Sequence, residues 1–445
     1  MIKSDKFNAT IQNYGCNGEG VTKVNGETVF VPYSLVGENV DGIVIKANSK
    51  YAIGKIEQIN IKSHCRINAP CPYFAKCGGC QLQHTTYENS LKIKTEIVKN
   101  AIKNIGKIDC DIPTVLPSKE QYHYRNKIDM PINPKTKKLG MFRTASHNII
   151  DIEECLLQKT LTAKLITVFN KYLSQTKTPI YDDVTKKGVL KHLVARELDD
   201  KILITVVINS NDLPDKKFLV EFLSQNFDNF GLSLNINKLK NNVILTNRFV
   251  QVYGLTKIDV CENEISYSIT NGSFLQINDQ IKDTMYQKIF EQIENETVVD
   301  AYSGAGLLSA MIAKHAKQVY GIEIVEEATK IADRLKADNM IQNLTNINGD
   351  CAEKLPALLE GLTAEEKSNL IVVIDPPRKG CDKKVLEAIL NVRPKKIIYM
   401  SCDPSTLARD LNILLNDTNY KIAYLQPFDM FPQTKHVETL AVLEC

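Results

Sequence analysis

Apolar and polar residues alternate over short intervals in the first sixty residues, as they do in half-buried β-strands. The runs FNATIQNYG, GVTKV, ETVFVP, ENVDGIVIKA and YAIGKIEQI are separated by Gly and Asn turns. This spacing predicts a small antiparallel barrel over residues 1–60. A helical period follows in YENSLKIKTEIVKNAIKNIG, and Gly106 marks its end. The apolar stripe of this helix is formed by Leu91, Ile97, Val98, Ala101 and Ile105.

From about residue 280 the pattern changes to helices that alternate with buried strands such as TVVDAY, QVYGIEI, NLIVVID and KKIIYMSC. This alternation is typical of a doubly wound, Rossmann-like parallel sheet. The stretch before it is strand-rich, and VLKHLVAREL and KILITVVIN flank a predicted hairpin turn at Asp199 and Asp200. We therefore expect an α/β protein with a barrel at 1–60, a central domain at 61–265 and a doubly wound domain at 266–445. The helix near 86–106 is a candidate to pack on the last domain.

The composition and length of the chain indicate which broad class of protein it belongs to. A chain of 445 residues is longer than one hydrophobic core usually serves, and its formal net charge of +3 is too small to indicate a partner. The N-terminal residues lack the apolar core of a signal peptide, and no apolar run approaches the roughly 18 residues of a membrane span. The sequence therefore predicts a soluble cytoplasmic protein. In that compartment its twelve cysteines suit metal or catalytic roles better than disulfides.

A candidate cofactor turn lies in VVDAYSGAG, where a buried strand ends in Asp300 and a glycine turn. Glycines allow a backbone to approach a ligand closely. The dinucleotide fingerprint is only half met, because Ser309 occupies its last position. Glu323 ends the next strand, where a carboxylate can hold ribose hydroxyls, and Asp350 follows the strand after that. These acids favour S-adenosylmethionine, which has no phosphate, while capping acids on an ordinary α/β fold are the alternative.

Cys402 lies at the carboxyl end of the strand IIYMSC, with Asp403 and Pro404 at the start of the following helix. A helix N-terminus is expected to favour the thiolate, and an inert buried cysteine is the alternative. VVIDPPRKG ends a strand at the same edge, with Arg378 where methylases of exocyclic amines usually carry an aromatic residue. The target is therefore expected to be a carbon. Thiolate addition at C6 of uracil would activate C5 for methyl transfer.

The methylated adduct keeps a proton on C5, which a base has to remove before the thiol can leave. The segment DMFPQTKHVETL offers His436 and Glu438 close together. We expect Glu438 to be the base and His436 to have a supporting part.

Six motifs, SFLQIN, DAYSGAG, GIE, DPPRKG, SCDPSTLARDL and DMFPQTKHVET, resemble in this order those of the RNA uracil-C5 methyltransferases. The resemblance covers essentially the whole chain and implies a methyltransferase domain at 266–445, with Cys402 as nucleophile and Glu438 as proton acceptor. The segment GEGVTKVNGETVFVPYSLVGENV resembles an OB-like TRAM domain, an RNA-binding barrel found in some members. The cofactor contacts implied by the resemblance are Gln276, Tyr302, Glu323 and Asp375, with Asp350 as a further candidate.

Three cysteines lie close together in CPYFAKCGGC, residues 71–80. Family members with both a TRAM domain and this motif bind a [4Fe–4S] cluster, whose irons four thiolates satisfy. Cys65 lies nearby but does not fit the spacing, and structural zinc is the alternative metal. The expected role of the cluster is to fix the fold or an RNA-facing surface. The ligands implied by the resemblance are Cys71, Cys77, Cys80 and Cys155.

Basic and aromatic side chains are interleaved between residues 113 and 143, with seven basic residues against two acidic ones. Such a segment can neutralise phosphates and stack on unpaired bases, although an ordinary charged surface is the alternative. Relatives that modify tRNA generally lack the cluster motif and the TRAM domain. The resemblance therefore implies an unpaired or loop uridine of 23S ribosomal RNA, with a tRNA uridine as the alternative. The aromatic rings in this segment include Tyr122, His123, Tyr124 and Phe142.

Two other classes of protein share part of this pattern. A radical S-adenosylmethionine methylthiotransferase also combines a TRAM domain with an iron–sulfur cluster, but it needs a different cysteine spacing. A non-catalytic RNA-binding protein would have no use for Cys402 and Glu438 together. We expect no membrane association and see no sign of an obligate protein partner.

Overall fold

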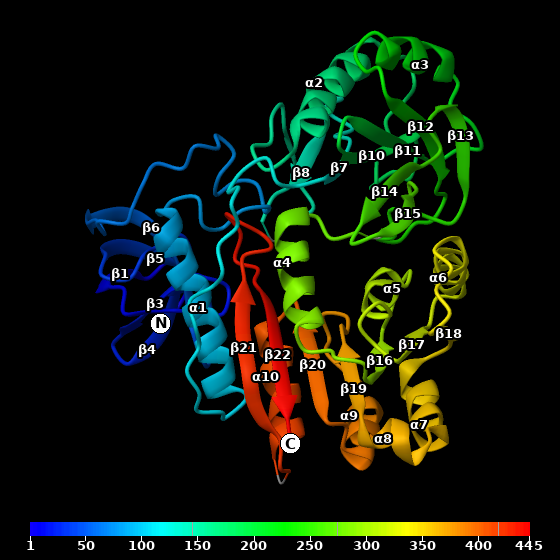
Figure 1. Ribbon diagram of the computed structural model, residues 1–445. Coiled ribbons are helices and arrows are strands. Elements are labelled where there is room, and N and C mark those ends of the chain that lie inside the picture. Colours follow the sequence, from blue (N-terminus) through cyan, green and yellow to red (C-terminus); the bar gives the residue numbers. More distant parts are fainter. Residues whose placement is uncertain (145, 274, 417) are drawn as a thin grey trace. The chain divides into compact units, whose positions relative to one another are not determined.

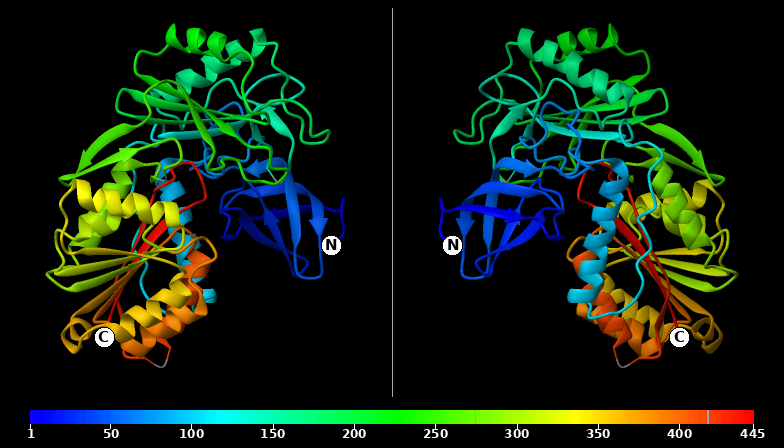
Figure 2. Two further views of the ribbon diagram at one scale, coloured as in Figure 1. Left: turned by 90° about the vertical axis from the view of Figure 1, so that its right-hand side faces the viewer. Right: turned by 90° about the vertical axis from the view of Figure 1, so that its left-hand side faces the viewer.

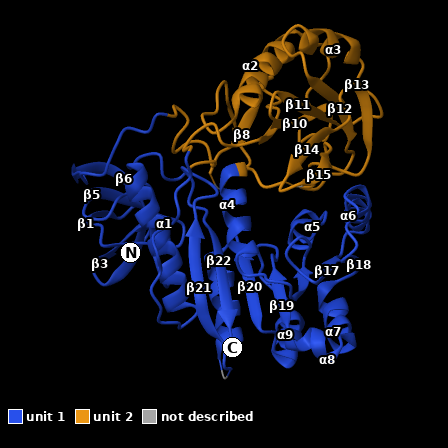
Figure 3. Cartoon of the chain, viewed as in Figure 1, with its two compact units in different colours: residues 1–70, 81–119, 280–445 blue, residues 71–80, 120–279 orange. Residues whose placement is uncertain are grey.

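The computed structural model describes residues 1–144, 146–273, 275–416 and 418–445, and Figure 1 shows its helices and strands. These residues divide into two compact units, which Figure 3 shows in different colours. Unit 1 comprises residues 1–70, 81–119 and 280–445, and unit 2 comprises residues 71–80 and 120–279. Phe274, which belongs to the SFLQIN motif, lies outside the described residues.

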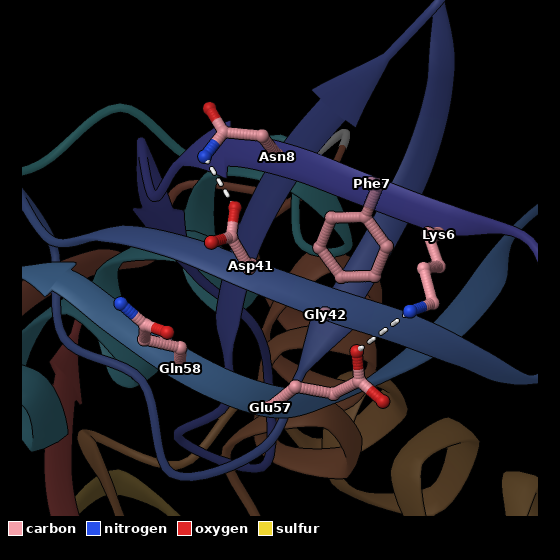
Figure 4. A pocket seen from close by; sticks show the side chains of 7 residues that line it. All are labelled: Lys6, Phe7, Asn8, Asp41, Gly42, Glu57 and Gln58. Carbon is pink, nitrogen blue, oxygen red and sulfur yellow. Dashed lines mark hydrogen bonds and ion pairs between the residues drawn. The ribbon is translucent and has the colours of Figure 1, made fainter.

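Within the described part of unit 1, the N-terminal residues form a six-stranded sheet in the order β1-β5-β6-β4-β3-β2. All its paired strands are antiparallel except β4 and β6. Phe7 packs in the core of this sheet, and a Cβ at Gly42 would lie 2.5 Å from its ring, so only glycine fits there. Figure 4 shows the side chains around this contact. The strands are β1 (Lys6–Thr10), β2 (Asn13–Tyr14), β3 (Gly20–Val24), β4 (Glu27–Val31), β5 (Asn39–Ala47) and β6 (Ala52–Ile61).

Helix α1 (Tyr87–Asn104) packs against α10 (Pro404–Leu415), and Figure 2 shows the two side by side. The Thr86 side chain caps its N-terminus. Ile102 belongs to the buried face, whereas Ile105, predicted to lie in the apolar stripe, is 47% exposed. The prediction for Ile105 was wrong: as the C-cap it keeps a helical backbone, with its N–H bonded to the Ala101 carbonyl, but its side chain lies at the exposed end of the helix.

The second sheet of unit 1 has the order β18-β17-β16-β19-β20-β22-β21 in the described residues. Its first five strands are parallel, as predicted, and the β21–β22 hairpin adds two antiparallel strands at one edge. The strands are β16 (Thr297–Ala301), β17 (Gln318–Glu323), β18 (Leu344–Asn348), β19 (Leu370–Ile374), β20 (Lys396–Ser401), β21 (Lys421–Phe428) and β22 (Glu438–Glu444). The accompanying helices are α4 (Asp279–Phe290), α5 (Leu307–Ile312), α6 (Glu326–Asp338), α7 (Cys351–Gly361), α8 (Ala364–Ser368) and α9 (Lys383–Val392).

Unit 2 contains a five-stranded sheet in the order β13-β12-β11-β10-β7, again within the described residues. The predicted hairpin is confirmed, because β10 and β11 pair up to Leu198 and Lys201 with Asp199 in a left-handed turn. None of the described helices is both long and apolar enough to cross a lipid bilayer. The strands are β7 (Lys127–Pro131), β8 (Gly140–Phe142), β9 (Ile149–Asp151), β10 (Leu190–Leu198), β11 (Lys201–Ile208), β12 (Phe230–Ile236), β13 (Phe249–Gly254), β14 (Ile258–Glu262) and β15 (Ile265–Ile269), and the helices are α2 (Thr160–Gln175) and α3 (Lys216–Ser224).

Candidate active site

The turn after β16 has an unusual backbone. Tyr302, Gly304 and Gly306 all have positive φ angles, of 69°, 57° and 79°. A Cβ at Gly306 would lie 2.6 Å from the Cβ of Ala332, whereas nothing lies within 4 Å of the corresponding point at Gly304. The absence of a side chain at Gly306 therefore lets the turn pack on α6, while the backbone around Gly304 stays open to a ligand.

Glu323 ends β17 beside this turn. Its carboxylate accepts hydrogen bonds from the backbone N–H of Gly304 at 2.9 Å and from that of Val325 at 2.8 Å. The next residue, Ile324, is 62% exposed. A fixed carboxylate next to exposed apolar surface fits the ribose hydroxyls and the adenine ring of S-adenosylmethionine, because each carboxylate oxygen keeps a free lone pair.

The other acids at this edge differ in their surroundings. Asp300 is buried and accepts a hydrogen bond from Ser309. Burial raises the pKa of Asp300 to about 7, and the charges of Asp375 and Glu323 raise it as well. The hydrogen bond from Ser309 lowers the pKa and so partly opposes this rise. Asp375, directly after β19, is half-buried, and burial raises its pKa to about 7 as well. Asp350 is exposed and caps α7 through the backbone N–H of Ala352, which is a structural role.

Two further predicted cofactor residues are placed as follows. Tyr302 is half-buried at the turn after β16, and burial raises the pKa of its hydroxyl. Gln276 lies in unit 2, in the segment between β15 and α4. Its backbone carbonyl accepts a hydrogen bond of 2.9 Å from the side chain of Asn126, which holds the segment in place.

Cys402 directly follows β20, and Asp403 caps α10 by accepting a hydrogen bond from the backbone N–H of Ser405 at 2.8 Å. The sequence predicted that the helix N-terminus would favour the thiolate. The structure corrects this prediction, because burial raises the pKa of the Cys402 thiol to about 11. The Glu438 carboxylate raises it further, and the nearby Arg378 guanidinium only partly opposes these effects. Cys402 is therefore mainly a thiol at neutral pH.

Glu438 is the first residue of β22 and is buried. β22 runs between β20 and β21, where Thr439 pairs with Ser401 and Glu438 pairs with Phe428. Burial raises the pKa of Glu438 to about 8, the charge of Asp375 adds to the rise, and Arg378 opposes it. The sheet therefore brings the predicted nucleophile and the predicted base to the same end of adjacent strands.

His436 lies two residues before Glu438 and is half-buried. Its ring meets the ring of Phe431 edge-on, with 5.9 Å between the centroids. Burial lowers the pKa of His436 to about 4, and the positive charges of Arg378, Lys435 and Lys94 act in the same direction. Its imidazole is therefore neutral at physiological pH and is a poor proton acceptor.

The predicted cluster ligands Cys71, Cys77, Cys80 and Cys155 all belong to unit 2. Burial raises the pKa of Cys77, the hydrogen bond from the Gly79 N–H opposes the rise, and the neighbouring Cys155 and Cys71 add to it. These thiols are the donor type that iron and zinc prefer. Among the described residues, however, no group of three or more His, Cys, Asp or Glu side chains is arranged to hold a metal ion. The structure therefore does not confirm the cluster.

The basic and aromatic segment at residues 113–143 is only partly exposed. Tyr124 is 4% exposed and belongs to the protein interior, so it is not available to stack on a base. Phe142 is exposed, and its carbonyl accepts a hydrogen bond from the Gly78 N–H at 3.0 Å, within the cysteine motif. Of these two rings, only Phe142 retains the predicted capacity to stack on RNA.

Comparisons with known proteins place the chain in a family. The model of the tRNA (uracil-5-)-methyltransferase family matches residues 86–445, and the TRAM domain model matches residues 5–56. An RNA methyltransferase of Clostridium tetani is 37% identical over 450 residues, covering 99% of this chain and 96% of the relative. One from Listeria monocytogenes is 36% identical over 451 residues, covering 100% of this chain and 98% of the relative.

A solved structure shows the same fold over nearly the whole length. It is the Pyrococcus abyssi tRNA (uracil-54, C5)-methyltransferase in complex with S-adenosyl-L-homocysteine. It is 26% identical, with a TM-score of 0.77, and the match covers 98% of this chain and all of the other. These findings confirm the family, the TRAM domain and the fold class that the sequence motifs predicted. The chain therefore belongs to the S-adenosylmethionine-dependent RNA uracil-C5 methyltransferase family and has an N-terminal TRAM domain.

Proposed function

We propose that the protein methylates C5 of a uridine through a covalent adduct between Cys402 and C6, and that Glu438 removes the C5 proton. The observation that carries this proposal is the placement of Cys402 and Glu438 at the same end of β20 and β22. Asp375 and Arg378 act electrostatically on both side chains, so the four groups form one site.

The reaction starts when the Cys402 thiol loses its proton to solvent, which the nearby Arg378 guanidinium favours. The thiolate then adds to C6 while the electrons of the C5–C6 double bond move toward the C4 carbonyl. Bound S-adenosylmethionine would supply the electrophilic methyl group that C5 takes, with S-adenosylhomocysteine as the leaving group. The Glu438 carboxylate accepts the C5 proton, the double bond re-forms and the C6–S bond breaks, which returns the thiolate to Cys402. The Arg378 guanidinium lowers the pKa of both residues and so raises the fraction of each that is ionised.

For the cofactor, we propose that Glu323 holds the ribose hydroxyls and that the open backbone at Gly304 accommodates the nucleoside. The hydrogen bonds that fix the Glu323 carboxylate support this assignment. The remaining proposed contacts rest on their positions in the family motifs. They are Gln276, Tyr302 and Asp375; Asp350, which caps α7, stays a further candidate.

We also propose that Cys71, Cys77, Cys80 and Cys155 bind a [4Fe–4S] cluster that stabilises the loops around them. The motif spacing and the electrostatic effect of Cys71 and Cys155 on Cys77 support this proposal. Four thiolates could equally hold a structural zinc ion, so the metal has to be identified by analysis.

For the substrate, we propose an unpaired uridine of 23S ribosomal RNA in the cytoplasm, because the TRAM domain and the cysteine motif occur together in this chain. A tRNA uridine is the second candidate. It is favoured by the similarity to the Pyrococcus abyssi enzyme, which acts on uracil-54 of tRNA, over 98% of this chain. In either RNA the base has to leave its stack to reach Cys402.

Mass mapping of 5-methyluridine in ribosomal RNA and tRNA tests the proposal. A strain that lacks the gene is compared with strains that carry the wild-type or the Cys402→Ala gene. We expect one or more ribosomal positions to lose the methyl group and only the wild-type gene to restore it. Loss confined to a tRNA position would replace the ribosomal substrate and leave the chemistry intact. Full restoration by Cys402→Ala would refute the covalent mechanism.

A further inference from the structure

A buried ion pair contacts the segment 429–437, which directly precedes the proposed base Glu438 in the chain. Lys94, on α1, forms a salt bridge with Asp429, and both side chains are 0% exposed. Asp429 directly follows β21, whose last residue, Phe428, pairs with Glu438. The ammonium group of Lys94 also donates a hydrogen bond of 2.9 Å to the carbonyl oxygen of Phe431. Lys94 therefore holds two points of the segment 429–437.

Asp429 has further partners. The Tyr87 hydroxyl donates a hydrogen bond of 2.8 Å to its second carboxylate oxygen, and the same hydroxyl accepts one of 2.8 Å from the Ser118 N–H. The backbone N–H of Asp429 donates to the carbonyl of Leu116 at 2.9 Å. Both carboxylate oxygens and the backbone are thus bonded to residues that precede the methyltransferase sheet in the chain.

The segment 429–437 has two more attachments to the N-terminal part of unit 1. The backbone N–H groups of Gln81 and Leu82 donate to the carbonyl of Gln433 at 3.1 and 3.0 Å. The N–H of Lys435 donates to the side chain of Gln81 at 3.1 Å, and its ammonium group donates to the side chain of Asn17. The conformation of the segment is therefore set from outside the sheet that it joins.

A fully buried ion pair is a costly way to gain stability, because desolvation of both charges offsets much of their attraction. Its value here lies in geometry, since two charged groups with several hydrogen bonds allow one arrangement. Lys94 is also close enough to the site to act electrostatically on His436. We propose that Lys94 and Asp429 are positioning residues, which hold the segment 429–437 so that the Glu438 carboxylate meets the C5 proton. This inference rests on the proposed role of Glu438.

The test compares Lys94→Met and Asp429→Asn with Glu438→Gln in steady-state methylation of 23S ribosomal RNA taken from the strain that lacks the gene. We expect kcat to fall about 100-fold in both positioning variants, the loss that a small misplacement of a reacting group causes. KM for RNA and for S-adenosylmethionine should stay within about twofold, because neither residue contacts them in the proposal. The covalent enzyme–RNA adduct should accumulate on denaturing gels, since addition proceeds and proton removal slows.

Lys395→Met is the matched control. It breaks an ion pair with Glu296, a buried carboxylate just before β16, at the opposite end of the same sheet from Cys402. It should change stability and leave the adduct level unchanged. If Lys94→Met does not fold, Tyr87→Phe can be tested in its place. It removes the hydrogen bonds of this hydroxyl to Asp429 and Ser118 but keeps the Lys94–Asp429 ion pair, so we expect a smaller fall in kcat.

The outcomes separate the two proposals. Adduct accumulation in Glu438→Gln, with wild-type turnover in the Lys94, Asp429 and Tyr87 variants, would overturn the positioning role alone. No accumulation in Glu438→Gln would overturn the proposed role of Glu438 itself. A fall in kcat/KM caused only by a higher KM would show that the pair serves binding and not proton removal, which also contradicts the inference.

Discussion

Cys402 and Glu438 lie just beyond the point where the ladder between β20 and β22 ends, with Ser401 paired to Thr439. After burial, the Glu438 carboxylate is the strongest influence that raises the pKa of the Cys402 thiol to about 11. The two groups therefore disfavour each other's charge at rest, although the proposed reaction uses both as anions. Arg378 is the positive group that moderates this conflict.

The first prediction concerns the pH dependence of methyl transfer. Glu438 accepts a proton only as a carboxylate, and burial raises its pKa to about 8, so the single-turnover rate should rise with pH through that region. Because Cys402 and Glu438 interact, the apparent pKa read from this profile describes the two groups together and not either one alone. In Arg378→Gln the rising limb should move to higher pH, because Arg378 lowers the pKa of both groups.

The matched variant for this profile is Glu438→Gln, which keeps the shape of the side chain but cannot accept the proton. Its rate should fall by about 100- to 10,000-fold, the usual contribution of a general base. A wild-type rate that stays flat between about pH 6 and pH 9, while chemistry is rate-limiting, would contradict the assignment of Glu438.

The second prediction concerns the covalent step. RNA that carries 5-fluorouridine at the target should form a denaturation-resistant adduct, because fluorine at C5 cannot leave as the proton does. Cys402→Ala should form none and should lose methylation. Cys261→Ser, which changes an exposed cysteine of unit 2, is the control and should behave like the wild type. An adduct in Cys402→Ala would assign the nucleophile to another residue.

The sequence predicted the fold where periodicity and local chemistry agree. The parallel strands β16 to β20, the hairpin at Asp199 and the cap at Asp403 follow from patterns within a few residues. The motifs also identified the family, which the comparisons confirm. Cys402 and Glu438 could be proposed together because the reaction needs both a nucleophile and a base.

Features that depend on distant residues escaped prediction. β22 was not predicted, because the segment around Glu438 was interpreted only for its chemistry. The pKa of Cys402 was predicted in the wrong direction, since the helix N-terminus is visible in the sequence and burial beside Glu438 is not. The partnership of Lys94 with Asp429 spans 335 positions, and no local pattern indicates it.

The third prediction concerns stability against pH. The pKa of Asp300 is raised to about 7, that of Asp375 to about 7 and that of Glu438 to about 8. Folding therefore favours the neutral forms of these three carboxyl groups. The stability that they contribute is fully present below about pH 4, near the pKa that they have in the unfolded chain. It is lost progressively as the pH rises from about 4 to about 8. The free energy of unfolding without ligand should fall over this range, as measured by urea denaturation at several pH values.

Two variants test whether Asp300 contributes to this slope. Asparagine cannot ionise, so Asp300→Asn should flatten the fall of the unfolding free energy with pH. Each unit by which folding raises the pKa of a carboxyl group corresponds to about 1.4 kcal/mol of this fall. Ser309→Ala removes the hydrogen bond that opposes the rise and should steepen it. An unchanged slope in Asp300→Asn would show that this carboxyl group is not the source.

The fourth prediction concerns the turn that we assign to the cofactor. Gly306→Ala places a Cβ 2.6 Å from that of Ala332, so the turn has to shift or α6 has to move. Gly304→Ala meets no atom within 4 Å and carries only the backbone strain of a positive φ, about 1–2 kcal/mol. Thermal unfolding should therefore show the larger loss for Gly306→Ala. Equal losses of stability would indicate that backbone strain, and not packing on α6, is the reason why position 306 requires glycine.

The fifth prediction concerns the cysteines of unit 2. If they hold a [4Fe–4S] cluster, protein purified without oxygen should contain about four iron and four sulfide per chain. Cys71→Ser should lose most of this content, whereas Cys65→Ser, a nearby cysteine outside the motif spacing, should keep it. The electronic absorption spectrum gives a readout that does not depend on methylation. One zinc per chain without sulfide would assign the site to structural zinc, because tetrahedral zinc needs the same four thiolates and no inorganic sulfur. Equal iron loss in both variants would mean that the motif does not define the ligands.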